Sequence, residues 1–271
     1  MEQGKELTME EIHDVGLRLL KDFHKWAVEN DVKYSITYGT LIGQIRYKGF
    51  IPWDNDIDIM VSRPDFEKLV DFYLKGNKIN DQTALVHYKV DPKFHLCYAR
   101  VTDTNTIINH GYVNEQYDNS GVWLDILPLD GFYPDKYTKF HEAYRIWVRA
   151  LTLFYQFHHK DLPLIYWGKK VVKLFYSNKN NKCVDRVNAL IQKYKYDNGD
   201  NEYVADLTQP YPCVIKKACM DDIELVPFED TELYAIKDYD EFLRSIYGDY
   251  MTPPQDNERI PNNYTEYWRK K

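Results

Sequence analysis

The apolar positions of the N-terminal half recur first at helical spacing and then at strand spacing. Residues 8–31 predict a helix, because their apolar side chains return every three or four positions. These side chains are Ile12, Val15, Leu19, Phe23 and Trp26. Thr8 followed by Glu11 is the capping-box pattern that marks a helix start. The chain is therefore expected to open with an amphipathic helix.

Shorter elements follow, separated by turn residues. Strands are predicted at 34–38, 57–61, 83–88, 95–102, 105–109 and 122–127, and two more within 223–236. Pro128 is predicted to end the strand at 122–127, since proline has no N–H for a strand ladder. Further helices are predicted to open at Thr40 and Pro64, to fill most of 136–195 and to span 238–247.

This order of elements predicts an α/β (α+β) chain with a mixed-sheet core. The core is expected over residues 1–135 and a helical insertion over 136–200. Residues 201–271 are expected to form a C-terminal closing segment that packs back on the core.

Composition removes several classes of function. The 35 Lys+Arg against 42 Asp+Glu give a net charge of −7, which argues against a chain that coats nucleic acid. The four cysteines show no C-x-x-C spacing, which favours free thiols in a reducing cytoplasm over a zinc ribbon. The N-terminus has no apolar core like that of a secretory signal. No run of about 18 apolar residues predicts a membrane-spanning helix.

The strongest chemical signal is the pair Asp56 and Asp58 in an apolar run. Alternate side chains of a strand share a face, about 6.5 Å apart at the Cα atoms, so both carboxylates point the same way. Two such groups repel each other unless a cation lies between them, and oxygen ligands favour Mg²⁺ or Mn²⁺. The competing interpretation is an exposed strand edge decorated with acids, which the neighbours Ile57 and Ile59 disfavour.

A phosphate-binding turn is predicted just upstream, where a strand runs through Gly39 and Thr40 into a helix. Glycine allows a ligand to approach the backbone, and a helix N-terminus favours an anion. Arg46 and Lys48 follow, close enough in sequence to meet a polyphosphate. Each feature alone also fits an ordinary turn or a solvated loop. Their order ahead of the acidic strand is what indicates phosphate binding.

Asp125 lies between apolar residues in a predicted strand, where a lone carboxylate is costly. It needs a metal, an arginine or backbone N–H groups as a partner. As a third carboxylate beside a metal it can complete coordination or take a proton from an incoming hydroxyl. An Asp that caps the following turn is an equal alternative. Asp130, before Gly131, is predicted to be a turn residue.

These residues carry a family resemblance. Gly39 to Gly43 (GTLIG), followed by Arg46 to Asp58 (RYKGFIPWDNDID), resembles the signature of the LicD family. That family belongs to the nucleotidyltransferase-fold superfamily and includes fukutin-related proteins. Residues 124–130 (LDILPLD) and 239–254 (YDEFLRSIYGDYMTPP) resemble its second and closing blocks.

The resemblance implies a nucleotidyltransferase-like core and a CDP-alcohol-dependent phosphotransferase. LicD-type enzymes move phosphocholine from CDP-choline to a sugar hydroxyl of a bacterial surface glycan, such as a teichoic acid or lipooligosaccharide. By this resemblance Asp56, Asp58 and Asp125 are the catalytic and metal-binding residues, with Mg²⁺ or Mn²⁺ as cofactor. Nucleic acid is not an expected partner. The expected location is the cytoplasm, at the inner face of the membrane.

Several alternatives share these residues. A nucleotidyltransferase moves the nucleotide itself and releases pyrophosphate. Relatives of the family use other donors, such as CDP-ribitol, and CDP-glycerol is a further candidate. A sugar-nucleotide glycosyltransferase also uses D-x-D, but usually after a longer nucleotide-binding unit than the 55 residues before Asp56. A scaffold with a dead site is disfavoured because all three acids are present.

Residues 144–176 combine many apolar and aromatic side chains with lysines. Such a mixture marks either a buried helical core or an interfacial helix. The second interpretation predicts a peripheral membrane contact at which a lipid-linked glycan acceptor is met.

Overall fold

The computed structural model describes most of the chain. The described residues are 3–94, 96–110, 119–137, 139, 142, 167, 182–197, 199–209, 211–255, 257, 259 and 265–270. The α-helices are α1 (Met9–Glu29), α2 (Tyr38–Tyr47), α3 (Arg63–Leu74), α6 (Lys182–Ile191) and α7 (Asp240–Tyr247). The 3-10 turns within the described residues are Pro134–Lys136 and Lys217–Met220. Within these residues, no helix is long and apolar enough to cross a membrane.

The strands of the described residues form three sheets. They are β1 (Gln3–Glu6), β2 (Tyr34–Ile36), β3 (Asp58–Ser62), β4 (Thr83–Val86), β5 (Ala99–Asp103), β6 (Thr106–His110), β7 (Trp123–Phe132), β8 (Tyr203–Asp206), β9 (Cys213–Lys216), β10 (Ile223–Phe228), β11 (Thr231–Ile236) and β12 (Thr265–Lys270). The central sheet has the order β2-β3-β7-β5-β4, with β8 paired to β7 and β9 to β8. Its β3–β7 pair is parallel and its other pairs are antiparallel.

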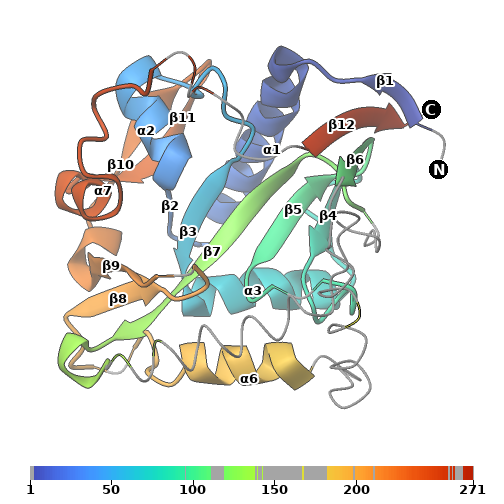
Figure 1. The fold of residues 1–271 in the computed structure, drawn as a ribbon. Coiled ribbons are helices and arrows are strands. Elements are labelled where there is room, and N and C mark those ends of the chain that lie inside the picture. The colour runs from blue at the N-terminus through green and yellow to red at the C-terminus, as the bar shows by residue number, and fades with distance from the viewer. Residues whose placement is uncertain are drawn as a thin grey trace.

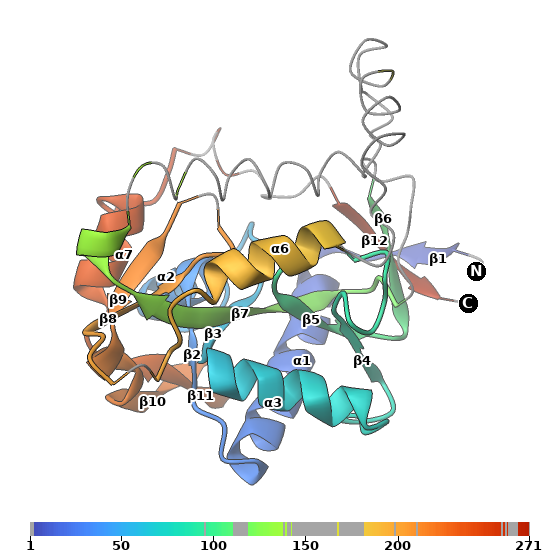
Figure 2. The same cartoon turned by 90° about the horizontal axis from the view of Figure 1, so that it is seen from below.

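Helices cover both faces of this sheet (Figures 1 and 2). α1 and α3 lie on one face and α6 on the other, as Figure 2 shows along the edge of the sheet. Apolar side chains of α1, α3 and the strands form one large buried cluster. Val184, Val187 and Ile191 of α6 join Phe132 and Ala205 in a second, smaller cluster. These layers confirm the predicted mixed α/β class and hold the edge strands in place.

The opening helix follows the predicted pattern. Its N-cap Thr8 and Glu11 form the reciprocal capping box, with the Glu11 N–H donating to Thr8 Oγ1 at 3.2 Å. The predicted apolar stripe is buried along the whole helix. The predictions of a strand near 34–38, of helices near Thr40, Pro64 and 238–247, and of a β10–β11 hairpin in 223–236 are confirmed, with shifted ends.

The prediction that Pro128 ends a strand is wrong, because β7 runs through it from Trp123 to Phe132. β5 pairs with β7 only as far as Ile126, and β8 pairs from Leu129 onward. The Asp125 N–H donates to Ile57 on the β3 side, so by alternation position 128 faces away from β3. Pro128 therefore occupies the gap between two neighbours, where no N–H is needed.

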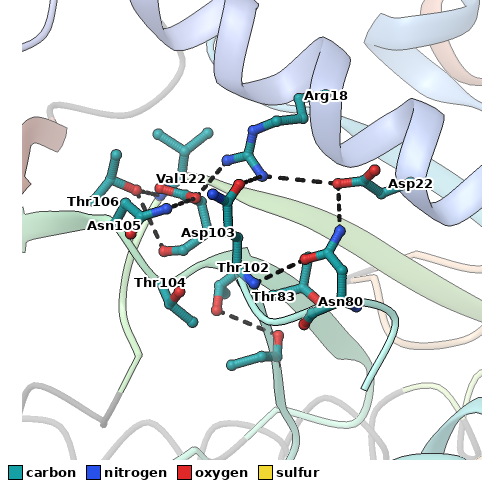
Figure 3. Close-up of polar contacts among 12 residues, drawn as sticks. Arg18, Asp22, Asn80, Thr83, Thr102, Asp103, Thr104, Asn105, Thr106 and Val122 are labelled. Atoms are coloured by element: carbon teal, nitrogen blue, oxygen red, sulfur yellow. Dashed lines mark hydrogen bonds and ion pairs between the residues drawn. The ribbon is translucent and has the colours of Figure 1, made fainter.

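A polar network holds α1 to the edge of the central sheet (Figure 3). Arg18 donates to Asp103, a buried carboxylate at the end of β5, at 2.5 Å. Asp22, one turn later, accepts from Asn80 at 2.8 Å. This network lies apart from the acidic residues of the sequence signature, so its role is to fix the scaffold.

Segments that are distant in sequence complete the sheets. β12 pairs with β6 and β1, which places the last described residues beside the first ones (Figure 1). β8 and β9 extend the central sheet beyond β7. Most of the predicted helical region 136–195 lies outside the described residues. The main part of it that the structure describes is α6.

Candidate active site

The parallel pair β3–β7 brings two predicted acids together. Asp58 lies opposite Asp125 in the strand register, and the Asp125 N–H donates to Ile57 O at 2.8 Å. Asp56 precedes β3 in a turn where its N–H donates to Asp54 Oδ1 at 3.2 Å. All three predicted carboxylates, Asp56, Asp58 and Asp125, line one cleft of about 590 Å³.

Residues from the C-terminal half form the rest of this cleft. The loop between β8 and β9 contributes Gln209, Tyr211 and Pro212, the start of β9 contributes Cys213, and the end of α7 contributes Ser245, Ile246 and Tyr247. Tyr38 and Tyr98 complete an aromatic lining together with Tyr211 and Tyr247. The cleft is therefore acidic where the strands begin and aromatic along its walls.

The electrostatics of Asp58 show that negative charge is concentrated here. Burial raises the pKa of Asp58 well above its usual range, and the nearby Asp125 and Asp56 carboxylates raise it further. Burial also raises the pKa of Tyr247, and the charge of Asp58 adds to this effect. A cation placed among these oxygens relieves the repulsion.

Arg100 of β5 is the partner of Asp125, and the motif analysis did not single it out. The two residues face each other in the antiparallel register, and Arg100 Nε donates to Asp125 Oδ1 at 2.7 Å. Burial raises the pKa of Asp125, while the Arg100 charge and hydrogen bond act in the opposite direction. The sequence required a metal, an arginine or backbone N–H groups as the partner of Asp125, and the structure shows that an arginine takes this role.

Asp206 is a further acid that the motif analysis missed. It ends β8 and is almost fully buried, and it accepts from Tyr38 Oη at 2.9 Å and from the Thr208 N–H at 2.8 Å. Its charge also contributes to the raised pKa values of Asp58 and Asp125. Tyr38 has a positive φ of 47°, so the hydroxyl contact holds a strained residue at the start of α2.

Gly39 and Thr40 lie beside the acids at the start of α2. A side chain on Gly39 would meet Asp54 Oδ2 at 2.6 Å, so it would have to displace the Asp54 carboxylate that accepts from the Asp56 N–H. Thr40 is buried, and its Oγ1 accepts from the Asp58 N–H at 2.9 Å. In this arrangement Thr40 fixes the first residue of β3.

Arg46 and Lys48 lie at the other end of α2 and do not line the cleft described above. Arg46 donates to Tyr47 Oη at 2.8 Å and stacks over the same ring. Lys48 is the left-handed C-cap of the helix, with φ 60°, and its carbonyl accepts from Glu229 N. The structure therefore brings together Asp56, Asp58, Asp125, Gly39 and Thr40 but not these two cations.

The donor set suits a hard cation that is shared with a substrate. Among the residues that the structure describes, no three His, Cys, Asp or Glu side chains form a ready-made metal cage. Mg²⁺ is usually held by one or two carboxylates together with substrate phosphates. Asp56 and Asp58, on neighbouring positions of the cleft wall, fit that mode, and Asp125 lies next to Asp58.

Comparisons with known proteins identify relatives of the chain by sequence. The chain is 26% identical over 285 residues to the lipopolysaccharide cholinephosphotransferase LicD of Haemophilus influenzae, covering 97% of this chain and 98% of that protein. It is 28% identical over 129 residues to an uncharacterized protein of Rickettsia prowazekii, covering 47% of this chain and 43% of that protein. Residues 31–144 match the family model described as LicD/FKTN/FKRP, nucleotidyltransferase domain. Asp56, Asp58 and Asp125 lie within this range, and residues 31–144 are a nucleotidyltransferase domain of the LicD family.

Proposed function

We propose that this chain transfers phosphocholine from CDP-choline to a sugar hydroxyl of a bacterial surface glycan, such as a lipooligosaccharide or a teichoic acid. The similarity to a lipopolysaccharide cholinephosphotransferase supports the substrate class, because it spans nearly the full length of both chains. The structural observation that most directly supports the proposal is the strand register, which places Asp58 opposite Asp125 in an open cleft.

The proposal includes a divalent cation, Mg²⁺ or Mn²⁺. Asp56 and Asp58 would hold it, and Asp125, next to Asp58, is then available to act on the acceptor hydroxyl. When bound, it neutralises charge on the donor diphosphate. The surrounding protein contributes fixed positions for the carboxylates, through the Thr40 bond to the Asp58 N–H and the Asp54 bond to the Asp56 N–H.

The reaction needs a base for the acceptor hydroxyl. The hydroxyl oxygen forms a bond to the phosphorus nearer to choline, and the bond from that phosphorus to the bridging oxygen breaks. CMP leaves with the bond electrons, and the hydroxyl proton passes to a carboxylate, for which we propose Asp125. The hydrogen bond from Arg100 Nε to Asp125 Oδ1 fixes the orientation of Asp125, which lines the cleft, so the carboxylate is already in position.

The aromatic walls suit the choline end of the donor. Quaternary ammonium groups bind the faces of aromatic rings. Tyr38, Tyr98, Tyr211 and Tyr247 line the cleft, and Tyr211 is 72% exposed, so its ring is accessible. These rings support choline over ribitol or glycerol as the donor alcohol.

The leaving group tests the proposal directly. Purified protein is incubated with Mg²⁺, a hexosamine-containing acceptor, and either CDP-choline, CDP-ethanolamine, CDP-glycerol, CDP-ribitol or nucleoside triphosphates. We expect CMP from CDP-choline. Release of pyrophosphate from a triphosphate would show nucleotidyl transfer and contradict the proposed mechanism. Release of CMP only from another CDP-alcohol would overturn the choline assignment.

We further propose that the reaction takes place in the cytoplasm at the inner membrane face. The segment 144–176, on which a membrane contact was predicted, lies outside the described residues except for Trp167, whose side chain is exposed. Co-sedimentation with anionic liposomes at low salt tests this contact, and absence of binding would remove it.

A further inference from the structure

The side chains that line the cleft carry more negative than positive charge, which is unfavourable for binding an anionic donor. Asp56, Asp58 and Asp125 line it, and among the described lining residues Arg100 carries the one positive charge. A diphosphate that enters this cleft meets carboxylates first. A bound divalent cation offsets part of this repulsion, and a second cation is needed on the protein side.

Arg100 is held in a fixed orientation by its surroundings. Its guanidinium carbon lies 4.1 Å from the centroid of the Trp123 ring and 5.7 Å from that of Phe94. Its Nη2 donates to Tyr98 Oη at 3.2 Å, and its Nε donates to Asp125. A planar guanidinium that is held by aromatic contacts and hydrogen bonds loses little entropy on binding a further anion.

The position of Arg100 links it to the reacting groups. Arg100 on β5 is opposite Asp125 on β7, and Asp125 is opposite Asp58 on β3. One row of the sheet thus presents a guanidinium, a carboxylate and a second carboxylate side by side. Arginine binds phosphate oxygens with two parallel N–H bonds, which a point charge cannot do.

We infer that Arg100 binds the diphosphate of the nucleotide donor, on the β5 side of Asp125 and two strands away from Asp58. This inference rests on the proposed function and adds to it the protein group that contacts phosphate. Arg46 and Lys48, the cations that the sequence order suggested, lie at the far end of α2. On this assignment their contribution to donor affinity is secondary to that of Arg100.

The test measures binding by calorimetry with Mg²⁺ and four probes: CDP-choline, CDP, inorganic pyrophosphate and cytidine. Arg100→Gln keeps an N–H donor for Asp125, and Arg100→Lys keeps the charge. Arg186→Met serves as the matched control, because Arg186 is exposed on α6 and does not line the cleft. Arg46→Met tests the competing candidate for the phosphate-binding residue, Arg46.

For Arg100→Gln we expect affinity for all three phosphate probes to fall by about tenfold or more, because charge-assisted bonds are lost. Cytidine binding, which involves no phosphate, should be unchanged. Arg100→Lys should fall in between, and the control should match the wild type. Circular dichroism and thermal unfolding of each variant verify that it is folded, and Arg100→Lys carries the test if Arg100→Gln is not.

Two outcomes would overturn the inference. If folded Arg100→Gln and Arg100→Lys bind the phosphate probes like wild type, Arg100 does not contact the diphosphate, whereas the proposed function stands. If Arg46→Met is the variant that loses phosphate affinity, the donor lies along α2 instead. A wild-type protein that binds no diphosphate with Mg²⁺ would contradict both the inference and the proposed function.

Discussion

Asp58 of β3 and Asp125 of β7 are opposite each other in a parallel strand pair, so two acids from segments more than 60 residues apart share one cleft wall. Burial and the neighbouring carboxylates raise the pKa of Asp58. A carboxyl group whose pKa is raised by folding stabilises the fold while it is protonated. This contribution is present below about pH 4, the pKa of an unfolded aspartate, and is lost as the pH rises through the folded pKa.

Replacing Asp58 should therefore separate stability from activity. Asp58→Asn is expected to abolish turnover and to raise the melting temperature of metal-free protein at about pH 8, where the wild-type site is charged. Mg²⁺ should raise the melting temperature of wild type more at about pH 8 than at about pH 5, and that of the variant at neither. Thermal unfolding with and without Mg²⁺ measures both effects. Turnover of Asp58→Asn within a few-fold of wild type would place the site elsewhere.

Asp125 is expected to act in the reaction as well as in the ion pair with Arg100. Asp125→Asn keeps the shape of the side chain but removes its charge, and we expect kcat to fall by about 10²-fold or more. Steady-state kinetics and thermal unfolding distinguish this from a structural role. A purely structural Asp125 would give a lower melting temperature with near-normal kcat.

Thr40 is expected to act as a positioning residue. Thr40→Val leaves the buried Asp58 N–H without its acceptor, at a cost of about 1–3 kcal/mol, and should move the first residue of β3. Thr40→Ser keeps the hydroxyl and should have nearly wild-type kcat, whereas Thr40→Val should lower it by about tenfold or more. Equal kcat for the two variants would show that the hydroxyl does not position Asp58.

Part of this site could be predicted because its signal is local. Because Asp56 and Asp58 alternate with Ile57 and Ile59, the sequence predicts that both carboxylates point the same way. Both do line the cleft, although β3 begins only at Asp58 and Asp56 lies in the turn before it. The capping box of α1 is local in the same way, since Thr8 and Glu11 are three residues apart.

The remaining features depend on tertiary neighbours. β7 can continue past Pro128 because its pairing with β5 extends only to Ile126 and its pairing with β8 starts at Leu129. Asp206 is brought to the site by that same pairing of β8. Arg100 carried one usable signal, a lone arginine between apolar residues of a predicted strand, which needs a buried acid just as Asp125 needs a cation. The two residues could have been matched on that ground.

Asp130 corrects a second sequence prediction, since it lies inside β7 instead of in a turn. It is fully buried and accepts two bonds from Arg63 at the start of α3, Nε to Oδ1 at 2.9 Å and Nη2 to Oδ2 at 2.6 Å. Arg63→Met leaves the buried Asp130 carboxylate without its charged partner and should lower the free energy of unfolding by about 3–5 kcal/mol.

The double variant Arg63→Met/Asp130→Leu should recover most of this loss, because neither charge is then left unpaired. Urea unfolding measures all three proteins. The exposed pair Arg244 and Asp240 provides the control, and Arg244→Met should change stability little. If Arg63→Met were no more destabilising than Arg244→Met, the buried pair would not hold α3 to β7.

His87, next to the end of β4, gives the fold a second pH dependence of opposite sign. Burial lowers the pKa of His87 to about 3, and the charges of Lys89 and Arg63 act in the same direction. The unfolded chain takes up this proton near pH 6.5 while the folded chain does not. The stabilising effect of neutral His87 is therefore complete above about pH 6.5 and declines as the pH falls toward about 3, by up to about 1.4 kcal/mol per pH unit.

The pH range over which His87 affects stability overlaps the range for Asp58. The contribution of His87 is therefore measured as a difference in unfolding free energy between wild type and a variant. His87→Phe keeps an aromatic ring against Phe66, which the histidine contacts edge-on, but cannot be protonated. Urea unfolding at about pH 7.5 and about pH 5 should show that wild type loses about 2 kcal/mol more than His87→Phe over this interval. Asp58→Asn, measured in parallel, should retain the full His87 contribution. Equal losses in wild type and His87→Phe would mean that His87 is protonated in the folded protein at about pH 5, which its burial between Phe66 and Tyr88 argues against.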